Sequence, residues 1–174
     1  MATLDDLKSS LPSYAKDLKL NLGSLLDSPD LSPQQSWGCA VAVAIACRNA
    51  PLREAVLHDA AAHLSDEAMH AARGAAAIMG MNNIYYRSTH MLSEKDYSSM
   101  PVKLRMQIIG RPGIDKADFE LFCLAVSAVN GCGACLDSHD KVVRDAGLSK
   151  AAVQQSLRIA SVLHAIAVVL DAEA

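Results

Sequence analysis

Residues 115–139 read DKADFELFCLAVSAVNGCGACLDSH, and this stretch decides which fold the chain can adopt. Asp115 is suited to cap a helix, and an apolar run continues from there to Val129. Asn130-Gly131 interrupts the run, and a second helix is expected to start near Cys132. Because the break is so short, the two helices should pack closely. The stretch therefore predicts a helix pair with a CxxC sequence at the start of its second member.

The segments on either side of this pair also carry helix signals. Ser32-Pro33-Gln34-Gln35 forms a capping box, and the apolar run behind it extends to Cys47. Further helices are expected over residues 52–63, 65–78, 101–109, 132–147 and 149–173, with a break at Gly80. No segment shows the alternation of a half-buried strand. We predict an all-α fold of about eight helices.

Two parts of the chain resemble each other. Residues 77–81 align with residues 128–132, so that Gly80 corresponds to Gly131. Both halves would then contain a helix, a glycine break, a helix and a third helix. This similarity predicts a single domain over residues 1–174, built from two pseudo-repeats at about 1–100 and 101–174.

Composition and charge exclude several classes of protein. Of the 174 residues, 51% are hydrophobic, 20% charged and 4% aromatic, which is typical of a globular protein with a helical core. The net charge of −3 gives no reason to expect nucleic acid or an anionic membrane as a partner. The acidic start lacks the pattern of a signal peptide, and the longest apolar stretch, residues 38–47, is half the length that a bilayer requires. We therefore expect a cytoplasmic protein.

The five cysteines fall into two groups. Three lie among aliphatic residues and are interpreted as small buried hydrophobes: Cys39, Cys47 and Cys123. Cys132 and Cys135 form a CxxC pair, which in a reducing compartment is a redox or metal-binding motif. The methionines within apolar segments are expected to fill the core: Met79, Met81, Met91, Met100 and Met106.

The CxxC pair and a histidine share one helix face. Cys132, Cys135 and His139 stand at positions i, i+3 and i+7. At a helix start, unpaired amides and the helix dipole favour thiolate over thiol, so the trio describes a redox-active dithiol with a nearby base. Two alternatives stay open: a helix-face cysteine pair without a function, and a zinc site, for which Cys-x2-Cys-x3-His supplies only three ligands.

Glu120 is the single charge in the apolar run from Phe119 to Val126. One interpretation places it at the exposed helix start, where a carboxylate suits the dipole. The other makes it a buried proton acceptor that faces the CxxC helix and passes protons between His139 and a cysteine.

The residues alone leave open which cysteine is the nucleophile. The helix dipole is strongest at Cys132, and a CxxC at a helix start usually exposes its first cysteine. His139 lies one turn from Cys135 and two turns from Cys132, so assistance by the base favours Cys135.

The pattern Glu120-x11-Cys132-x2-Cys135-x3-His139 resembles the signature of the alkyl hydroperoxidase D (AhpD) family. Residues 11–17, 75–83 and 122–128 resemble that family as well, so the similarity covers most of the chain.

The resemblance implies an all-helical trimer, related in fold to the carboxymuconolactone decarboxylases. It implies an antioxidant enzyme, with no bound cofactor, that reduces organic hydroperoxides and also serves as the reductant of the peroxiredoxin AhpC. Dihydrolipoyl groups on a lipoyl-bearing dehydrogenase-complex protein would restore the dithiol. Cys135 would attack the peroxide, Cys132 would donate a proton and resolve the sulfenic acid, and Glu120 and His139 would form the proton relay. The sequence departs from the family at Ala134, where a second histidine is frequent.

Other functions remain to be distinguished from this one. The first alternative is a dithiol adaptor that transfers electrons between a lipoyl-bearing protein and a peroxiredoxin without reducing peroxide itself. A ring-opening decarboxylase of the related fold is disfavoured, because that chemistry does not need a CxxC. A zinc-stapled structural protein is the third alternative.

Overall fold

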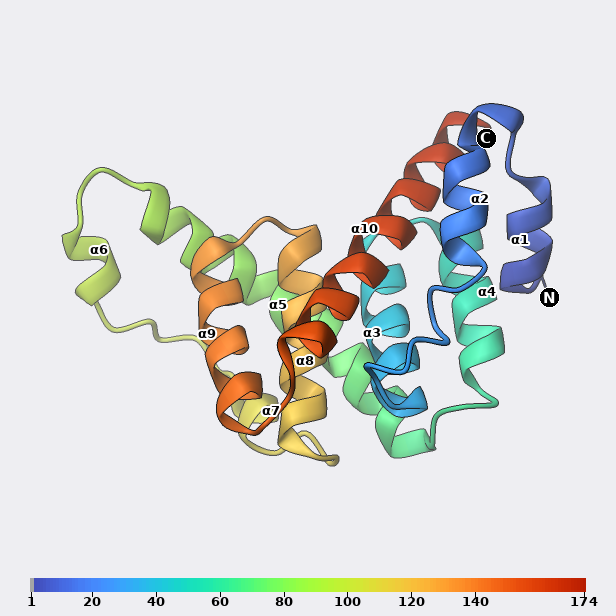
Figure 1. The fold of residues 1–174 in the computed structure, drawn as a ribbon. Helices are drawn as coiled ribbons and strands as arrows, with labels where there is room; N and C mark the ends of the chain where they lie inside the picture. The colour runs from blue at the N-terminus through green and yellow to red at the C-terminus, as the bar shows by residue number, and fades with distance from the viewer. Residues whose placement is uncertain (1) are drawn as a thin grey trace.

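The computed structural model describes residues 2–174, and over this range the chain is all-α, with ten α-helices and no strand (Figure 1). Eight of these helices have seven or more residues, which confirms the predicted fold class. The helices are α1 Leu4–Ser10, α2 Lys16–Leu22, α3 Pro33–Ala46, α4 Ala50–Ala60, α5 Asp66–Met91, α6 Asp96–Ser99, α7 Gln107–Gly110, α8 Lys116–Val129, α9 Gly133–Asp145 and α10 Lys150–Ala172, with a 3₁₀ turn at Ser13–Ala15.

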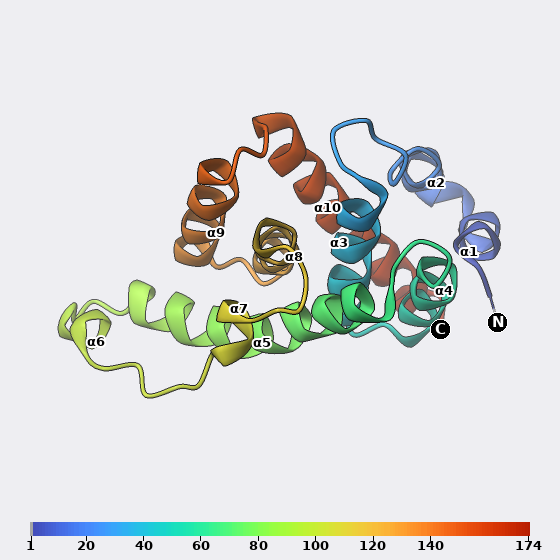
Figure 2. The ribbon, with the colours of Figure 1, turned by 90° about the horizontal axis from the view of Figure 1, so that it is seen from below.

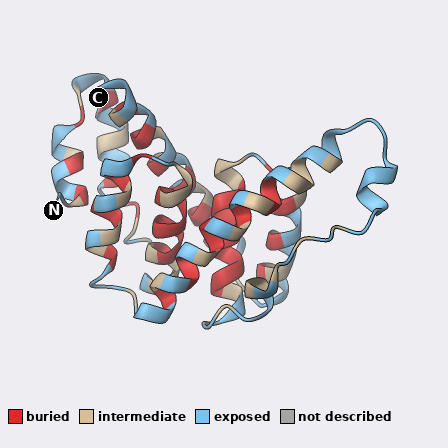
Figure 3. Cartoon of the chain, turned by 180° about the vertical axis from the view of Figure 1, so that it is seen from behind, coloured by how far each residue is buried: buried red, intermediate tan, exposed pale blue. Residues whose placement is uncertain are grey.

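Helix α8 is the centre of the fold. Figure 2 shows it enclosed by α3, α5, α9 and α10, the four helices with which it shares most of its contacts. Every residue from Asp118 to Ser127 is buried, as the colouring of Figure 3 illustrates for the core. A helix that is apolar on nearly all sides must be covered on all sides. The CxxC sequence, which follows α8 directly, is therefore attached to the most enclosed helix of the molecule.

Small residues allow α3 to approach α8 closely. A Cβ atom at Gly38 would lie 2.0 Å from Cζ of Phe122, so only glycine leaves room for the ring. Residues 39–44, which alternate alanine with valine after Cys39, are fully buried. The alanine-rich composition thus corresponds to close helix packing.

Helix α5 does not end at Gly80, contrary to the prediction from the sequence. It continues without a break from Asp66 to Met91. Gly80 lies on the exposed face, while Met79 and Asn82 beside it are buried in the core. Burial of neighbouring turns outweighs the cost of about 1 kcal/mol for a glycine within a helix.

The helix expected over residues 101–109 is also wrong, except for its last turn. Residues 101–106 are irregular, and Lys103 has a φ of 52°, which interrupts a right-handed helix. The half-buried residues are Val102, Leu104 and Met106, so the period of burial is two rather than 3.6. The proposed match of helix, glycine and third helix between the halves is therefore wrong, while the two pseudo-repeats stay a prediction.

Helix α10 has the length and apolar composition of a membrane-spanning helix. It packs against α3 and α8 (Figure 1), and its buried residues include Ile159, Leu163 and Ile166. Burial against other helices is the arrangement of a core helix, which meets the same criteria of length and composition.

The end of α5 and the short α6 extend away from the body of the molecule (Figure 1). Met91 and Met100 in this region are 74% and 56% exposed, so the prediction that they fill the core is wrong. Met79, by contrast, is 1% exposed. An apolar residue type alone therefore does not reveal whether a helical turn lies over the core or beyond its edge.

Candidate active site

The CxxC sequence begins at a turn that requires glycine. Gly131 has a φ of 65°, a left-handed conformation that glycine adopts without strain. The amide of Cys132 donates to the carbonyl of Ser127 (3.1 Å), and the amide of Gly131 donates to that of Ala128 (3.2 Å). These two bonds form a Schellman motif, and Cys132 is at the same time the N-cap of α9. The predicted position of the pair is confirmed, with Cys135 in the first turn of the helix.

The two sulfur atoms of the pair differ in access. They lie 2.13 Å apart, at disulfide distance, with 5.3 Å between the Cα atoms. Cys132 is 0% exposed, whereas Cys135 is 5% exposed and lines a cavity. The first cysteine is thus the enclosed one, opposite to the usual arrangement of a CxxC at a helix start. Access favours Cys135 as the sulfur that a substrate meets first.

A buried carboxylate–imidazole contact joins α8 to α9. Nδ1 of His139 and Oε2 of Glu120 lie 2.6 Å apart, and the two side chains are 9% and 5% exposed. Of the two interpretations of Glu120, the buried position facing the CxxC helix is confirmed, and its contact with His139 is direct. A carboxylate and an imidazole in such close contact, away from water, have the geometry of an acid–base pair.

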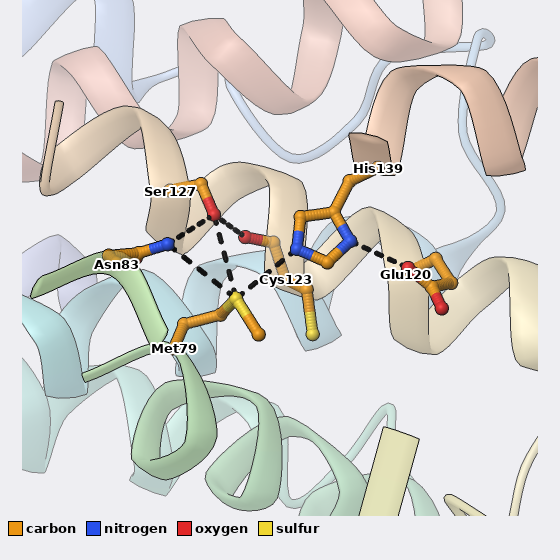
Figure 4. Close-up of polar contacts among 6 residues, drawn as sticks. All are labelled: Met79, Asn83, Glu120, Cys123, Ser127 and His139. Carbon is orange, nitrogen blue, oxygen red and sulfur yellow. Dashed lines mark hydrogen bonds and ion pairs between the residues drawn. The ribbon is translucent and has the colours of Figure 1, made fainter. Parts of the chain in front are cut away.

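The second ring nitrogen of His139 faces α5 rather than the CxxC pair. Nε2 lies 3.2 Å from Sδ of Met79 (Figure 4). A thioether sulfur accepts hydrogen bonds and cannot donate them, so this contact favours a proton on Nε2. Proton exchange is then left to Nδ1 and Glu120. The spacing of four residues predicted that the imidazole meets the Cys135 sulfur directly or through one water, whereas the partners of the ring nitrogens are Glu120 and Met79.

Met79 belongs to a buried polar cluster between α5 and α8 (Figure 4). Asn83 Nδ2 donates to Ser127 Oγ at 2.9 Å, and Ser127 Oγ donates to the carbonyl of Cys123 at 2.8 Å. Asn130 Nδ2 donates to Oδ1 of Asn83 at 2.9 Å. These bonds attach α5 to the last turn of α8, and hence to the turn that carries the CxxC pair.

A cavity of about 400 Å³ lies beside this arrangement. Cys135, His139 and Glu120 lie on its wall. Most of the remaining wall is apolar, and its residues are Met79, Asn82, Tyr86, Met106, Ile109, Ala134, Ser138 and Val142. A cavity of this volume is large enough for a small organic molecule. It brings such a molecule to the accessible thiol and the acid–base pair together.

Comparison with known proteins agrees with this geometry. The model of the carboxymuconolactone decarboxylase family matches residues 95–174, which contain the CxxC pair, Glu120 and His139. A protein of Solibacter usitatus named alkyl hydroperoxide reductase AhpD is 55% identical over 171 residues, which cover 98% of this chain and 97% of the relative. The chain belongs to the AhpD family. An AhpD protein of Gluconacetobacter diazotrophicus is 56% identical over 172 residues, covering 99% of this chain and 94% of that protein.

The resemblance to AhpD inferred from the CxxC spacing is therefore confirmed. Ala134, where the resemblance led us to expect a second histidine, lies on the cavity wall and adds no ionisable group there. Sequence reasoning missed the three wall residues contributed by α5, Met79, Asn82 and Tyr86. The expected break at Gly80 separated Met79 from the other two, although their spacing of three and four residues was the signal that could have placed all three on one helix face.

The zinc alternative gains no support from the side-chain arrangement. Across residues 2–174, no group of three or more histidine, cysteine, aspartate or glutamate side chains is placed to hold a metal ion. Cys132 and Cys135 face each other, and Nδ1 of His139 is bonded to Glu120.

The other three cysteines are held as thiols by burial. Desolvation raises the pKa of Cys47 to about 11 and raises the pKa of Cys39 further. The pKa of Cys123 is also well above its usual value because of burial, with the charge of Glu120 adding to the effect. Cys39 and Cys123 are buried as predicted, whereas Cys47 is only half-buried. None of the three has the lowered pKa of a reactive cysteine.

These raised pKa values predict a loss of stability in alkali. Between about pH 9 and 11 the unfolded chain ionises thiols that the folded chain keeps protonated, so the folded state binds more protons. The free energy of unfolding is then highest below pH 9 and falls by up to about 1.4 kcal/mol per pH unit for each fully buried thiol, and by less for Cys47. Urea titrations under reducing conditions from pH 8 to 11 measure the fall. The Cys123→Ala variant should show a shallower decline, and an unchanged slope would contradict this origin.

Proposed function

We propose that this protein is an antioxidant alkyl hydroperoxide reductase that works through the dithiol and disulfide forms of Cys132 and Cys135. The observation that carries the proposal is the position of Cys135 on the wall of a largely apolar cavity, next to the buried Glu120–His139 pair. The name shared by its relatives, alkyl hydroperoxide reductase, supports the same activity.

In the oxidative half of the cycle, the Cys135 thiolate attacks the terminal oxygen of a hydroperoxide, ROOH. The O–O bond breaks, the oxygen with its hydrogen stays on sulfur as a sulfenic acid, and the alkoxide leaves. The alkoxide takes a proton and leaves as ROH. Glu120 and His139 supply this proton, since both lie on the cavity wall and share a short hydrogen bond.

The sulfenic acid is then resolved by its neighbour. The thiol of Cys132 displaces water from the Cys135 sulfenic acid, and the disulfide forms. The disulfide distance between the two sulfur atoms supports this pairing. In the reductive half, a dihydrolipoyl group on a lipoyl-bearing dehydrogenase-complex protein opens the disulfide by thiol exchange and becomes oxidised. No bound cofactor takes part.

The proposal extends to assembly and partners. The reduced dithiol would also reduce the peroxiredoxin AhpC, the protein would act in the cytoplasm, and three copies would form a homotrimer. Analytical ultracentrifugation tests the last point through the mass of the assembly.

Both halves of the cycle can be tested in two successive steps on the same protein sample. Oxidised protein mixed with dihydrolipoamide should gain two thiols per chain at the CxxC pair, and cumene hydroperoxide added after removal of the donor should consume them with formation of one cumyl alcohol. The Cys39→Ala variant, which lacks a buried thiol outside the site, is the matched control and should behave as the wild type.

The two open functions give different results in this experiment. Thiol release by dihydrolipoamide without alcohol formation would replace the peroxidase by the dithiol adaptor. Failure of dihydrolipoamide to open the disulfide, with peroxide reduction intact under another dithiol, would remove the lipoyl donor from the proposal.

A further inference from the structure

Asn82 is a buried amide on the wall of the active-site cavity. It is 4% exposed, and its Oδ1 has no hydrogen-bond partner among residues 2–174. It lies on α5 three residues after Met79 and four before Tyr86, and all three line the cavity. Cys135 and Glu120 lie on the same wall.

The neighbouring asparagine shows what a structural amide looks like at this place. Asn83 is fully buried, donates to Ser127 and accepts from Asn130. A buried carbonyl oxygen without a donor is costly, because water is lost and nothing replaces it. Asn82 bears this cost on the wall of the cavity that Cys135 also lines, where a hydrogen-bond donor on a bound molecule would relieve it.

The wall around Asn82 indicates the chemical class of that ligand. The polar residues on the wall include Glu120, His139 and Asn82, and the apolar ones include Met106, Ile109 and Val142. A molecule that fits has a small apolar body and a polar end with a hydrogen atom to donate to Oδ1.

We propose that Asn82 binds the hydroperoxide group of the substrate, with Oδ1 accepting the hydrogen bond of its O–H. This inference rests on the proposed function. The hydrogen that Asn82 holds belongs to the oxygen that Cys135 attacks. When the S–O bond forms and the O–O bond breaks, this hydrogen stays with its oxygen in the sulfenic acid, and the leaving alkoxide takes its proton from the Glu120–His139 pair. Asn82 thus orients the reacting oxygen before and after the transfer.

The proposed hydrogen bond between the hydroperoxide and Asn82 has no counterpart in the reductive half of the cycle. A dihydrolipoyl group presents thiols, which are weak hydrogen-bond donors, and thiol exchange needs no oriented oxygen. Loss of the Asn82 amide should therefore slow the reaction with hydroperoxide and leave the reaction with dihydrolipoamide unchanged.

Asn82→Leu tests this inference, with Asn83→Leu as the matched control for stability. In single-turnover measurements, reduced Asn82→Leu should form sulfenic acid with cumene hydroperoxide about tenfold more slowly than the wild type, as expected for one lost hydrogen bond. Its rate of disulfide opening by dihydrolipoamide should be unchanged. Its melting temperature should equal or exceed that of the wild type, because an unpartnered oxygen is removed. Asn83→Leu should melt several degrees lower, because it loses bonds that are made.

Each other outcome overturns the inference. An unchanged rate with hydroperoxide removes Asn82 from substrate binding while leaving the proposed function intact. A melting temperature lowered as in Asn83→Leu, or equal slowing of both half-reactions, makes Asn82 a structural residue. Asn82→Ala, which adds no volume, repeats the comparison if leucine does not fit. A wild-type protein inert toward hydroperoxide overturns the proposed function itself, and this result is distinct because it needs no variant.

Discussion

Cys135→Ser should lose essentially all reduction of cumene hydroperoxide. Cys135 lies on the cavity wall, while Cys132 is fully buried and does not line the cavity. A serine hydroxyl has nearly the size of the thiol but does not ionise at neutral pH, so no nucleophile remains at the cavity wall. A coupled assay of peroxide consumption, with dihydrolipoamide as the donor, measures the loss. Circular dichroism and a melting curve establish that the variant is folded.

Cys132→Ser is the matched variant, since it keeps the nucleophile and removes the resolving thiol. It should consume one equivalent of hydroperoxide in a single turnover and then stop. A sulfenic-acid trap should then label Cys135, and mass spectrometry locates the label. If the trap labels Cys132 in the Cys135→Ser protein and nothing in the other variant, the roles of the two cysteines are reversed.

Glu120→Gln should lower the rate of hydroperoxide reduction by about 10², as is typical when an acid–base group is lost. The amide keeps the size of the side chain and can still bond Nδ1 of His139, which lies 2.6 Å away in the native protein. It cannot share a proton with the imidazole, so the leaving alkoxide loses its donor. The melting temperature should change little. Turnover from pH 6 to 8 measures the effect, and a wild-type rate over this whole range would contradict the relay.

Asp118→Asn is the control for Glu120→Gln, because both replace a buried carboxylate on α8. Asp118 accepts hydrogen bonds of 2.7 Å from Gln34 and from Gln35, and it lies outside the cavity wall. The asparagine side chain would point its NH₂ group at one of the two glutamine NH₂ groups, and one hydrogen bond would be lost. The free energy of unfolding should therefore fall by about 1–3 kcal/mol. Its rate of hydroperoxide reduction should be that of the wild type. The two variants thus separate a carboxylate that acts in the reaction from one that holds α3 against α8.

Local signals in the sequence predicted the helices that carry the site. The caps at Ser32 and Asp115 and the apolar runs behind them led to α3 and α8 with nearly correct bounds. The errors came where burial acts against local preference. Gly80 lies within a continuous helix because its neighbours are buried, and Lys103 interrupts a segment whose proline suggested a helix start.

The sequence by itself determined where the proposed reacting pair and its histidine lie on their helix. Cys132, Cys135 and His139 are separated by three and four residues, and the period of a helix places such residues on one face whatever else the chain does. The Asn130-Gly131 break placed the pair at a helix start for an equally local reason. Glu120 could be connected to them because only a short break separates its helix from theirs.

Tertiary structure alone decided what surrounds these groups. Met79 reaches His139 from 60 residues away, and Asn83 reaches Ser127 from 44 residues away. Both contacts require that α5 continues as one helix beyond Gly80 and packs against α8 in one particular position. That position is set by the packing of many side chains rather than by any spacing in the sequence. That packing also places Met79, Asn82 and Tyr86 of α5 on the wall of the cavity that Cys135 lines.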